Sequence, residues 1–248
     1  MAAIAGAITV AGMIATPLLP QGGRARRALS TVVVVGSFAT TTANAVRRWG
    51  APRTTVAATT TAVATTAVER IGTQTGLPFG RYAYTEALQP QIAHVPAIVP
   101  LAWFAMGLPA REAAHAALGE HSTPARRIAL GSAALTAWDL FLDPQMVGEG
   151  YWVWARRGLY RGIPLGYFVG WFVTGLGVMA ALETLLPPTA YSDGSADADG
   201  ALVAEYTFMG VMETVGFARY FRDPVVAIVG GLGMLPIAGA ALIGKLRD

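Results

Sequence analysis

Apolar stretches of about 20 residues recur along almost the whole chain, and short turns rich in arginine, glycine or proline separate them. A helix of that length can cross the hydrocarbon core of a bilayer because it satisfies its own backbone hydrogen bonds. Charged residues make up only 13% of the 248 residues, compared with about 25% in soluble domains. The mean hydropathy of +0.47 agrees with this. The sequence therefore predicts an integral membrane protein.

The apolar stretches predict an all-α, polytopic membrane bundle of seven or eight transmembrane helices, which forms one domain over residues 1–248 in the cell membrane. The expected spans are residues 2–19, 28–46, 54–68, 92–118, 125–142, 163–186, 201–217 and 224–243. Between the third and fourth spans, Gly72, Gly76, Pro78 and Gly80 are expected to break the helix. This segment is predicted to be a re-entrant or interfacial loop.

Charge and cysteine content narrow the possible partners. The net charge of +3 comes from arginines in short loops, which favours contact with anionic lipid headgroups over nucleic acid. The basic loops at 24–27, 156–161 and 219–222 lie on one side if the acidic loop at 191–200 lies on the other, whereas the loop at 47–53 does not fit this orientation. The chain has no cysteine, which excludes disulfides, thiolate metal sites and cysteine nucleophiles. The sequence predicts no oligomeric state.

Two aspartates stand inside an otherwise apolar segment. Asp139 and Asp143 are four residues apart, so a continuous helix would place them on one face. Pro144 is then expected to end or bend that helix. An ionisable side chain at membrane depth costs several kcal/mol and usually marks a functional site. The alternative is a capping role, or an ion pair with Arg156 or Arg157.

Glu69 is a third candidate acid, because it stands where the third expected span meets the glycine-rich turn. Its structural alternative is an ion pair with Arg70 or Arg81. Three further acids lie in the apolar stretches. Glu183 is expected to be an interfacial, solvated acid. Glu205 and Glu213 are eight residues apart on one expected helix and could line a polar seam.

Aromatic residues flank these acids and predict the walls of a lipophilic pocket. The expected substrate-binding residues are Phe79, Tyr82, Tyr84, Trp138, Trp152, Tyr167 and Trp171. The three histidines lack the i, i+3 or i, i+4 spacing of a helical metal clamp, and the segment GTQTG lacks the lysine of a phosphate loop. No metal and no cofactor are therefore expected.

Carboxyl groups without thiols, metal motifs or nucleotide motifs suit proton chemistry on an apolar molecule. A carboxylic acid in an apolar pocket tends to stay neutral and can donate its proton, while a second, ionised carboxylate can stabilise a cation or activate water. This pairing fits the hydration or the cyclisation of an alkene.

Four segments occur in the order ERIGTQTGLPFGRYAYT, VPAIVPLAWFAM, WDLFLDPQM and YWVWARRGLYRGIPLGYFVGW. In this order they resemble the membrane carotenoid biosynthesis proteins, a family that includes the carotenoid 1',2'-hydratases and bisanhydrobacterioruberin hydratase. The likeness covers about residues 69–175. One departure concerns the pattern GxPxxNFxGW, in which this chain has Tyr167 in place of the asparagine. That difference bears on the substrate or on the placement of water more than on the fold.

The resemblance implies that water is added to the terminal isopropylidene double bond of an acyclic carotenoid, without a cofactor. In this hypothesis Asp139 or Asp143 protonates the alkene to a tertiary cation, and the other aspartate stabilises the cation or directs water. Glu69 then acts as a base or a proton relay. The ring faces of nearby aromatic residues would shield the cation.

Three alternatives remain open. Intramembrane prenyltransferases of the lycopene elongase type also carry a DxxxD aspartate pair, which holds magnesium against a diphosphate, but they generally need two such motifs. An acid-driven carotenoid cyclase shares the cation and captures it with an internal alkene. A non-enzymatic carotenoid or lipid carrier would use the acids only as structural pairs.

Overall fold

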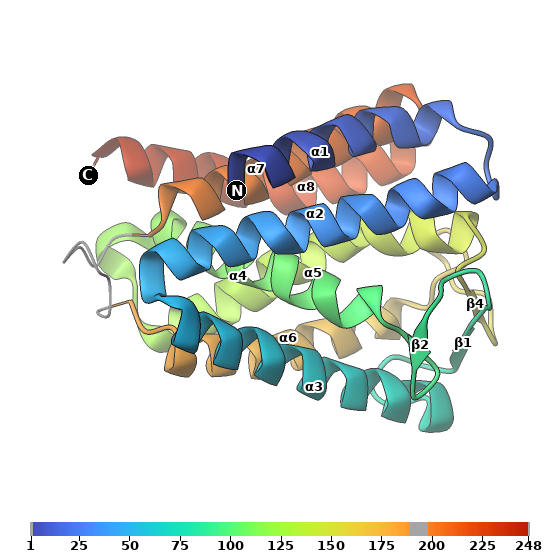
Figure 1. Ribbon diagram of the computed structural model, residues 1–248, viewed down its shortest axis with the longest axis horizontal. Coiled ribbons are helices and arrows are strands. Elements are labelled where there is room, and N and C mark those ends of the chain that lie inside the picture. Colours follow the sequence, from blue (N-terminus) through green and yellow to red (C-terminus); the bar gives the residue numbers. More distant parts are fainter. Residues whose placement is uncertain (1, 189–197, 248) are drawn as a thin grey trace.

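The computed structural model describes residues 2–188 and 198–247, and within them eight long helices run side by side in one bundle (Figure 1). The helices are α1 (Ala2–Ala15), α2 (Arg24–Trp49), α3 (Ala51–Thr75), α4 (Ile98–Leu118), α5 (Pro124–Gly148), α6 (Leu165–Leu185), α7 (Gly200–Arg219) and α8 (Pro224–Arg247). Short 3-10 turns follow α1 at Thr16–Leu18 and α4 at Gly119–His121. The expected all-α architecture is confirmed. Most of the acidic loop at 191–200 lies outside the described residues.

Four short strands lie together at one end of the bundle (Figure 1). Strand β1 (Tyr82–Tyr84) pairs antiparallel with β4 (Trp152–Trp154), and β2 (Gln91–Ile92) pairs antiparallel with β3 (Val95–Pro96). The predicted irregular segment between the third and fourth spans is therefore a small β structure. Its first strand is held by a segment 70 residues further along the chain, since Tyr82 lies opposite Trp154 and Tyr84 opposite Trp152.

Three of the helices are long and apolar enough to cross a membrane, namely α2, α6 and the Pro224–Leu246 part of α8. These helices fit a membrane protein. The predicted number of seven or eight spans is not confirmed. The other helices are shorter or more polar: α1 has 14 residues, α3 is rich in threonine, and α4 and α5 carry buried charged side chains.

The third helix is longer than its sequence predicts. It continues through Glu69 and Gly72 to Thr75, so Glu69 lies inside the helix, and the expected break at Gly72 is wrong. A Cβ atom on Gly72 would lie 2.8 Å from Cδ2 of Phe79, so the glycine makes room for a ring that packs against the helix. The helix ends at Gly76, whose φ of +83° is in the left-handed region that glycine adopts readily.

The fourth helix begins later than predicted, because residues 91–96 form the β2–β3 hairpin and α4 starts only at Ile98. This helix is the centre of the bundle, in contact with α2, α3, α5, α6, α7 and α8. Every residue from 103 to 114 is buried. The core of the protein is therefore built around one helix whose sequence includes two charged residues.

Prolines lie inside α4, α5 and α8, and distant side chains compensate for those of α4 and α5. Pro144 does not end α5, which continues one turn further to Gly148. A proline has no N–H and so leaves the carbonyl four residues earlier without its helical partner. The hydroxyl of Tyr160 donates to that carbonyl, on Leu140, at 2.8 Å. In α4, Pro109 frees the carbonyl of Ala105, which accepts from the Thr41 hydroxyl at 3.0 Å.

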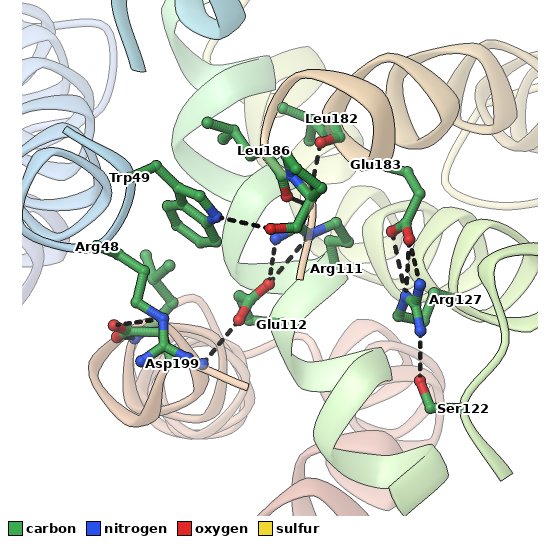
Figure 2. Close-up of polar contacts among 12 residues, drawn as sticks. Arg48, Trp49, Arg111, Glu112, Ser122, Arg127, Leu182, Glu183, Leu186 and Asp199 are labelled. Carbon is green, nitrogen blue, oxygen red and sulfur yellow. Dashed lines mark hydrogen bonds and ion pairs between the residues drawn. The ribbon is translucent and has the colours of Figure 1, made fainter. Parts of the chain in front are cut away.

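A buried polar cluster ties the helices together at the end opposite the strands (Figure 2). Arg111 of α4 pairs with its neighbour Glu112 at 2.5 Å and donates to the carbonyls of Leu182 and Leu186 at the end of α6, at 3.0 and 2.6 Å. Glu112 accepts the backbone N–H of Asp199 at 2.7 Å. The pair therefore holds the last turn of α6 and the residue before α7.

Asp199 and Glu183 have structural roles in the same region. The carboxylate of Asp199 caps α7 by accepting the N–H of Ala201 at 3.0 Å, and it pairs with Arg47 at 3.0 Å. The sequence predicts a solvated acid at Glu183, and this prediction is wrong: the side chain is only 12% exposed and accepts a hydrogen bond from Nε of Arg127 at 3.1 Å (Figure 2). The ion pair replaces the water that an exposed carboxylate would bind.

Arg111→Met is expected to lower the free energy of unfolding by about 3–5 kcal/mol, because Glu112 would be left as an unpaired buried charge. The double variant Arg111→Met/Glu112→Gln is expected to recover part of the loss, since the amide oxygen still accepts the Asp199 N–H. Circular dichroism during heating in detergent measures both. Arg126→Met, at an exposed position, is the control. Wild-type stability in Arg111→Met would contradict this account.

Candidate active site

Three buried carboxyl groups from two helices lie near one another. Glu69 comes from α3, and Asp139 and Asp143 come from α5. The exposed fractions are 4% for Glu69 and 0% for both aspartates. Asp139 is close enough to Asp143 and to Glu69 for their charges to interact. The fold therefore brings together the three acids that the sequence singles out, although their role in catalysis stays a prediction.

The β1–β4 pair packs against two of these acids. Side chains alternate between the two faces of a strand, and directly opposed residues of an antiparallel pair share a face. The sequences YAY and WVW therefore place Tyr82, Tyr84, Trp152 and Trp154 on a single face of the pair. That face is turned toward the helices, because the two tyrosines donate hydrogen bonds to Glu69 of α3 and the two tryptophans donate hydrogen bonds to Asp143 of α5.

Glu69 accepts hydrogen bonds from three neutral donors. The hydroxyl of Tyr82 and that of Tyr84, the latter at 2.8 Å, both bind Oε2, and the indole N–H of Trp103 binds Oε1 at 3.2 Å. Burial, followed by the negative charge of Glu69, raises the pKa of both tyrosines above its ordinary value. Each phenol therefore keeps its proton and remains a donor to the carboxylate.

The two aspartates differ in how many donors they have. Asp143 accepts the indole N–H of Trp152 on Oδ1 and that of Trp154 on Oδ2, the latter at 3.2 Å. Asp139 has one long contact, 3.5 Å from the Tyr167 hydroxyl to Oδ1. Its other oxygen, Oδ2, is buried and has no hydrogen-bond partner among the described residues. Asp143 is thus held as an acceptor at both oxygens, while Asp139 keeps one oxygen available.

Neutral side chains hold these acids, contrary to the ion pairs considered as alternatives. Within residues 2–188 and 198–247, the structure contains no ion pair between Glu69 and an arginine, or between either aspartate and an arginine. In the same ranges, no group of three or more His, Asp or Glu side chains is arranged to hold a metal ion.

The seven aromatic residues predicted to bind substrate form one connected network around the carboxyl groups. The ring centroids are separated by 5.8 Å for Phe79 and Tyr167, 6.3 Å for Phe79 and Tyr82, 5.4 Å for Tyr82 and Tyr84, 5.7 Å for Tyr84 and Trp152, 6.2 Å for Tyr167 and Trp171, and 6.3 Å for Trp138 and Trp171. Six of the seven are buried, and Tyr84 is partly buried. Their contact with a substrate stays a prediction.

Two tryptophans of this network were not predicted as site residues. Trp103 stacks on Trp171 with centroids 4.0 Å apart, and Trp154 lies 4.6 Å from Tyr167. Strand alternation in WVW was a usable signal for Trp154, because Trp152 was already a candidate. No comparable signal marks Trp103, which reaches the site only because α4 runs through the centre of the bundle.

A cavity of about 320 Å³ lies beside this network, between α1, α2, α4, α5 and α7. Trp138 belongs both to the aromatic network and to the cavity wall, whereas Glu69, Asp139 and Asp143 do not line the cavity. The residue spacing on α5 explains this. Trp138 and Leu142 face the cavity, and the aspartates that follow each of them are turned about 100° around the helix axis.

Comparison with known proteins adds two findings. The sequence model of a family described as carotenoid biosynthesis protein matches residues 29–236. Bisanhydrobacterioruberin hydratase from Haloarcula japonica is 30% identical over 110 residues, which are 44% of this chain and 37% of that protein. The similar segment thus spans well under half the length of this relative. No solved structure matches the chain.

Asp143→Asn is expected to destabilise the protein by about 1–3 kcal/mol, because the new amide N–H₂ would face an indole N–H where an acceptor is needed. Asp139→Asn is the matched comparison and is expected to have a smaller effect, since its amide nitrogen can occupy the position of Oδ2, which accepts no hydrogen bond. Thermal unfolding in detergent measures both variants. Equal loss of stability, or a larger loss in Asp139→Asn, would contradict the different environments of the two aspartates.

Proposed function

Because this chain belongs to the family of carotenoid biosynthesis proteins, we propose that it is a hydratase that adds water to the terminal double bond of an acyclic carotenoid. The family match confirms the resemblance found in the sequence motifs, and the similarity to a hydratase supports an enzyme of carotenoid biosynthesis. One structural observation carries the proposal further. Three buried carboxyl groups lie against one network of aromatic side chains, and an oxygen of Asp139 has no hydrogen-bond partner among the described residues.

The hydrogen bonds of the three acids differ, and this difference supports different roles for them in the proposed reaction. Donors aimed at both oxygens favour the ionised form of a carboxyl group, and this is the situation of Glu69 and Asp143. Asp139 lacks such donors and lies beside two groups of like charge, so its environment suits the neutral acid. We therefore assign Asp139 as the proton donor and Asp143 as the carboxylate that stabilises the cation.

The reaction needs only a proton and water. Asp139 gives its proton to the less substituted carbon of the terminal double bond, and the electron pair of the π bond forms the new C–H bond. The tertiary cation that results is stabilised by Asp143 and by the faces of the surrounding rings. The oxygen of water then bonds to the cationic carbon, and the surplus proton passes to Glu69 and back to Asp139. The net change is the addition of one water molecule.

Tyr167 is the position at which this chain departs from the motif of the family. The hydroxyl of Tyr167 is the group that contacts Asp139, and the ring lies 5.8 Å from Phe79 and 4.6 Å from Trp154. In the proposed mechanism Tyr167 orients the acid, and its bulk limits the shape of the carotenoid end group. The departure therefore bears on which end group is accepted.

Asp139→Asn is expected to lower the hydration rate by about 100-fold or more, because a positioned general acid usually contributes 10²–10⁴ in rate. The assay supplies an acyclic carotenoid to the purified full chain in detergent and follows the product mass. Asp223→Asn is the matched control, because Asp223 lies in a partly exposed ion pair with Arg161. Its rate is expected to match the wild type.

Other outcomes of this assay would contradict the proposed function. Full activity of Asp139→Asn would remove the assigned acid. A product of unchanged mass but different absorption would indicate a cyclase. A carotenoid product that is heavier by one prenyl unit, formed only with an allylic diphosphate and magnesium, would indicate a prenyltransferase. A carotenoid that binds to the protein but is not altered would indicate a carrier.

A further inference from the structure

The cavity of about 320 Å³ beside the aromatic network has the character of a binding site for an apolar chain. Its size lies at the lower end of the range of about 300–1,000 Å³ for small-molecule sites. The walls include Met106, Met146, Met209 and Met212, together with the ring of Trp138. Methionine is flexible and polarisable, so such walls adapt to an irregular or bent hydrocarbon.

One side of the cavity is formed by a helix outside the family match. Met13 and Ile14 of α1 line the cavity, whereas the match begins at residue 29. Helix α1 packs along α2 and has almost no contact with α7, although both helices border the cavity.

Glu213 of α7 is the one carboxyl group in the cavity lining formed by the described residues. Its side chain has no hydrogen bond or ion pair with other described residues. Glu213 is partly buried, and its carboxyl group lines the cavity. By contrast, Glu205, two turns earlier on the same helix, accepts a hydrogen bond from the side-chain amide of Asn44, and the oxygen of the Thr41 hydroxyl lies 2.6 Å from its Oε2. Glu213 is thus available to a ligand.

We propose that this cavity binds a long isoprenoid chain that carries a hydroxyl group, with the hydroxyl hydrogen-bonded to Glu213 and the chain lying along the methionine-lined walls. The choice of an alcohol rests on the proposed function, because hydration of an acyclic carotenoid gives such an alcohol. The cavity is then a site for a hydroxylated chain, separated from the three acids by Trp138. A lipid acyl chain and a cationic amphiphile are the other occupants that the test distinguishes.

The test measures binding rather than turnover. The purified full chain in nanodiscs of neutral lipid is titrated with an acyclic carotenoid that carries one tertiary hydroxyl, and separately with its parent hydrocarbon, and quenching of tryptophan fluorescence gives each Kd. The alcohol is expected to bind about tenfold more tightly, as one hydrogen bond to a carboxyl group predicts. Glu213→Leu is expected to abolish this preference with little change for the hydrocarbon, and Glu213→Gln is expected to retain part of it.

A second pair of variants tests the place of binding. Ser37 of α2 lines the cavity, so Ser37→Phe is expected to weaken binding of both ligands by tenfold or more. Val46→Phe, at an exposed position of the same helix, is the matched control and is expected to bind like the wild type. Unchanged binding in Ser37→Phe would overturn the assignment to this cavity.

Failure of this inference can be told apart from failure of the proposed function. A protein that prefers the alcohol through Glu213 but never adds water to a carotenoid supports the site and refutes the hydratase. Equal affinities for alcohol and hydrocarbon, or a preference that survives in Glu213→Leu, overturn the site whatever the activity. Tighter binding of a long-chain amine than of the alcohol also overturns it, in favour of a cationic ligand.

Discussion

Neutral hydrogen-bond donors, rather than cations, hold the buried carboxyl groups of this protein, and the rest of the site depends on that constraint. An ionised carboxylate in apolar surroundings is costly unless it is paired or fully hydrogen-bonded. Five phenol or indole donors meet this need for Glu69 and Asp143. Such donors cancel no charge. The negative charge thus remains available to a cation that forms beside it, whereas an arginine would compete with that cation.

Among the described residues, the ion pairs lie outside the group of three acids and stabilise the scaffold, and two of them, Arg26–Glu149 and Arg161–Asp223, involve residues close to β4 in the chain. Arg111 and Glu112 join α4 to the ends of α6 and α7 at the end of the bundle opposite the strands, and Arg127 pairs with Glu183 in the same region. This separation has a physical basis. Charged pairs can fix helix ends where backbone carbonyls and N–H groups also need partners, while Glu69 and Asp143 are bound by donors that do not neutralise them.

Much of this arrangement could be predicted from local sequence. The eight apolar stretches predict the eight long helices, and the four-residue spacing of Asp139 and Asp143 predicts that they share a face of α5. The motif order, through the family resemblance, added Glu69 to the same site. What local sequence did not reveal depends on distant residues. Gly72 stays helical because of Phe79, and α5 passes Pro144 with the help of Tyr160. Trp103 reaches Glu69 only through the central position of α4.

The central claim is that Asp139 keeps its proton while Asp143 and Glu69 are ionised. Infrared spectroscopy of the purified protein at neutral pH tests it directly, because a neutral carboxyl group has a C=O stretching band distinct from the bands of a carboxylate. Difference spectra between the wild type and each variant isolate one residue. We expect the neutral carboxyl band to be lost in Asp139→Asn and kept in Asp143→Asn. Loss of that band in Asp143→Asn, with no change in Asp139→Asn, would contradict the account.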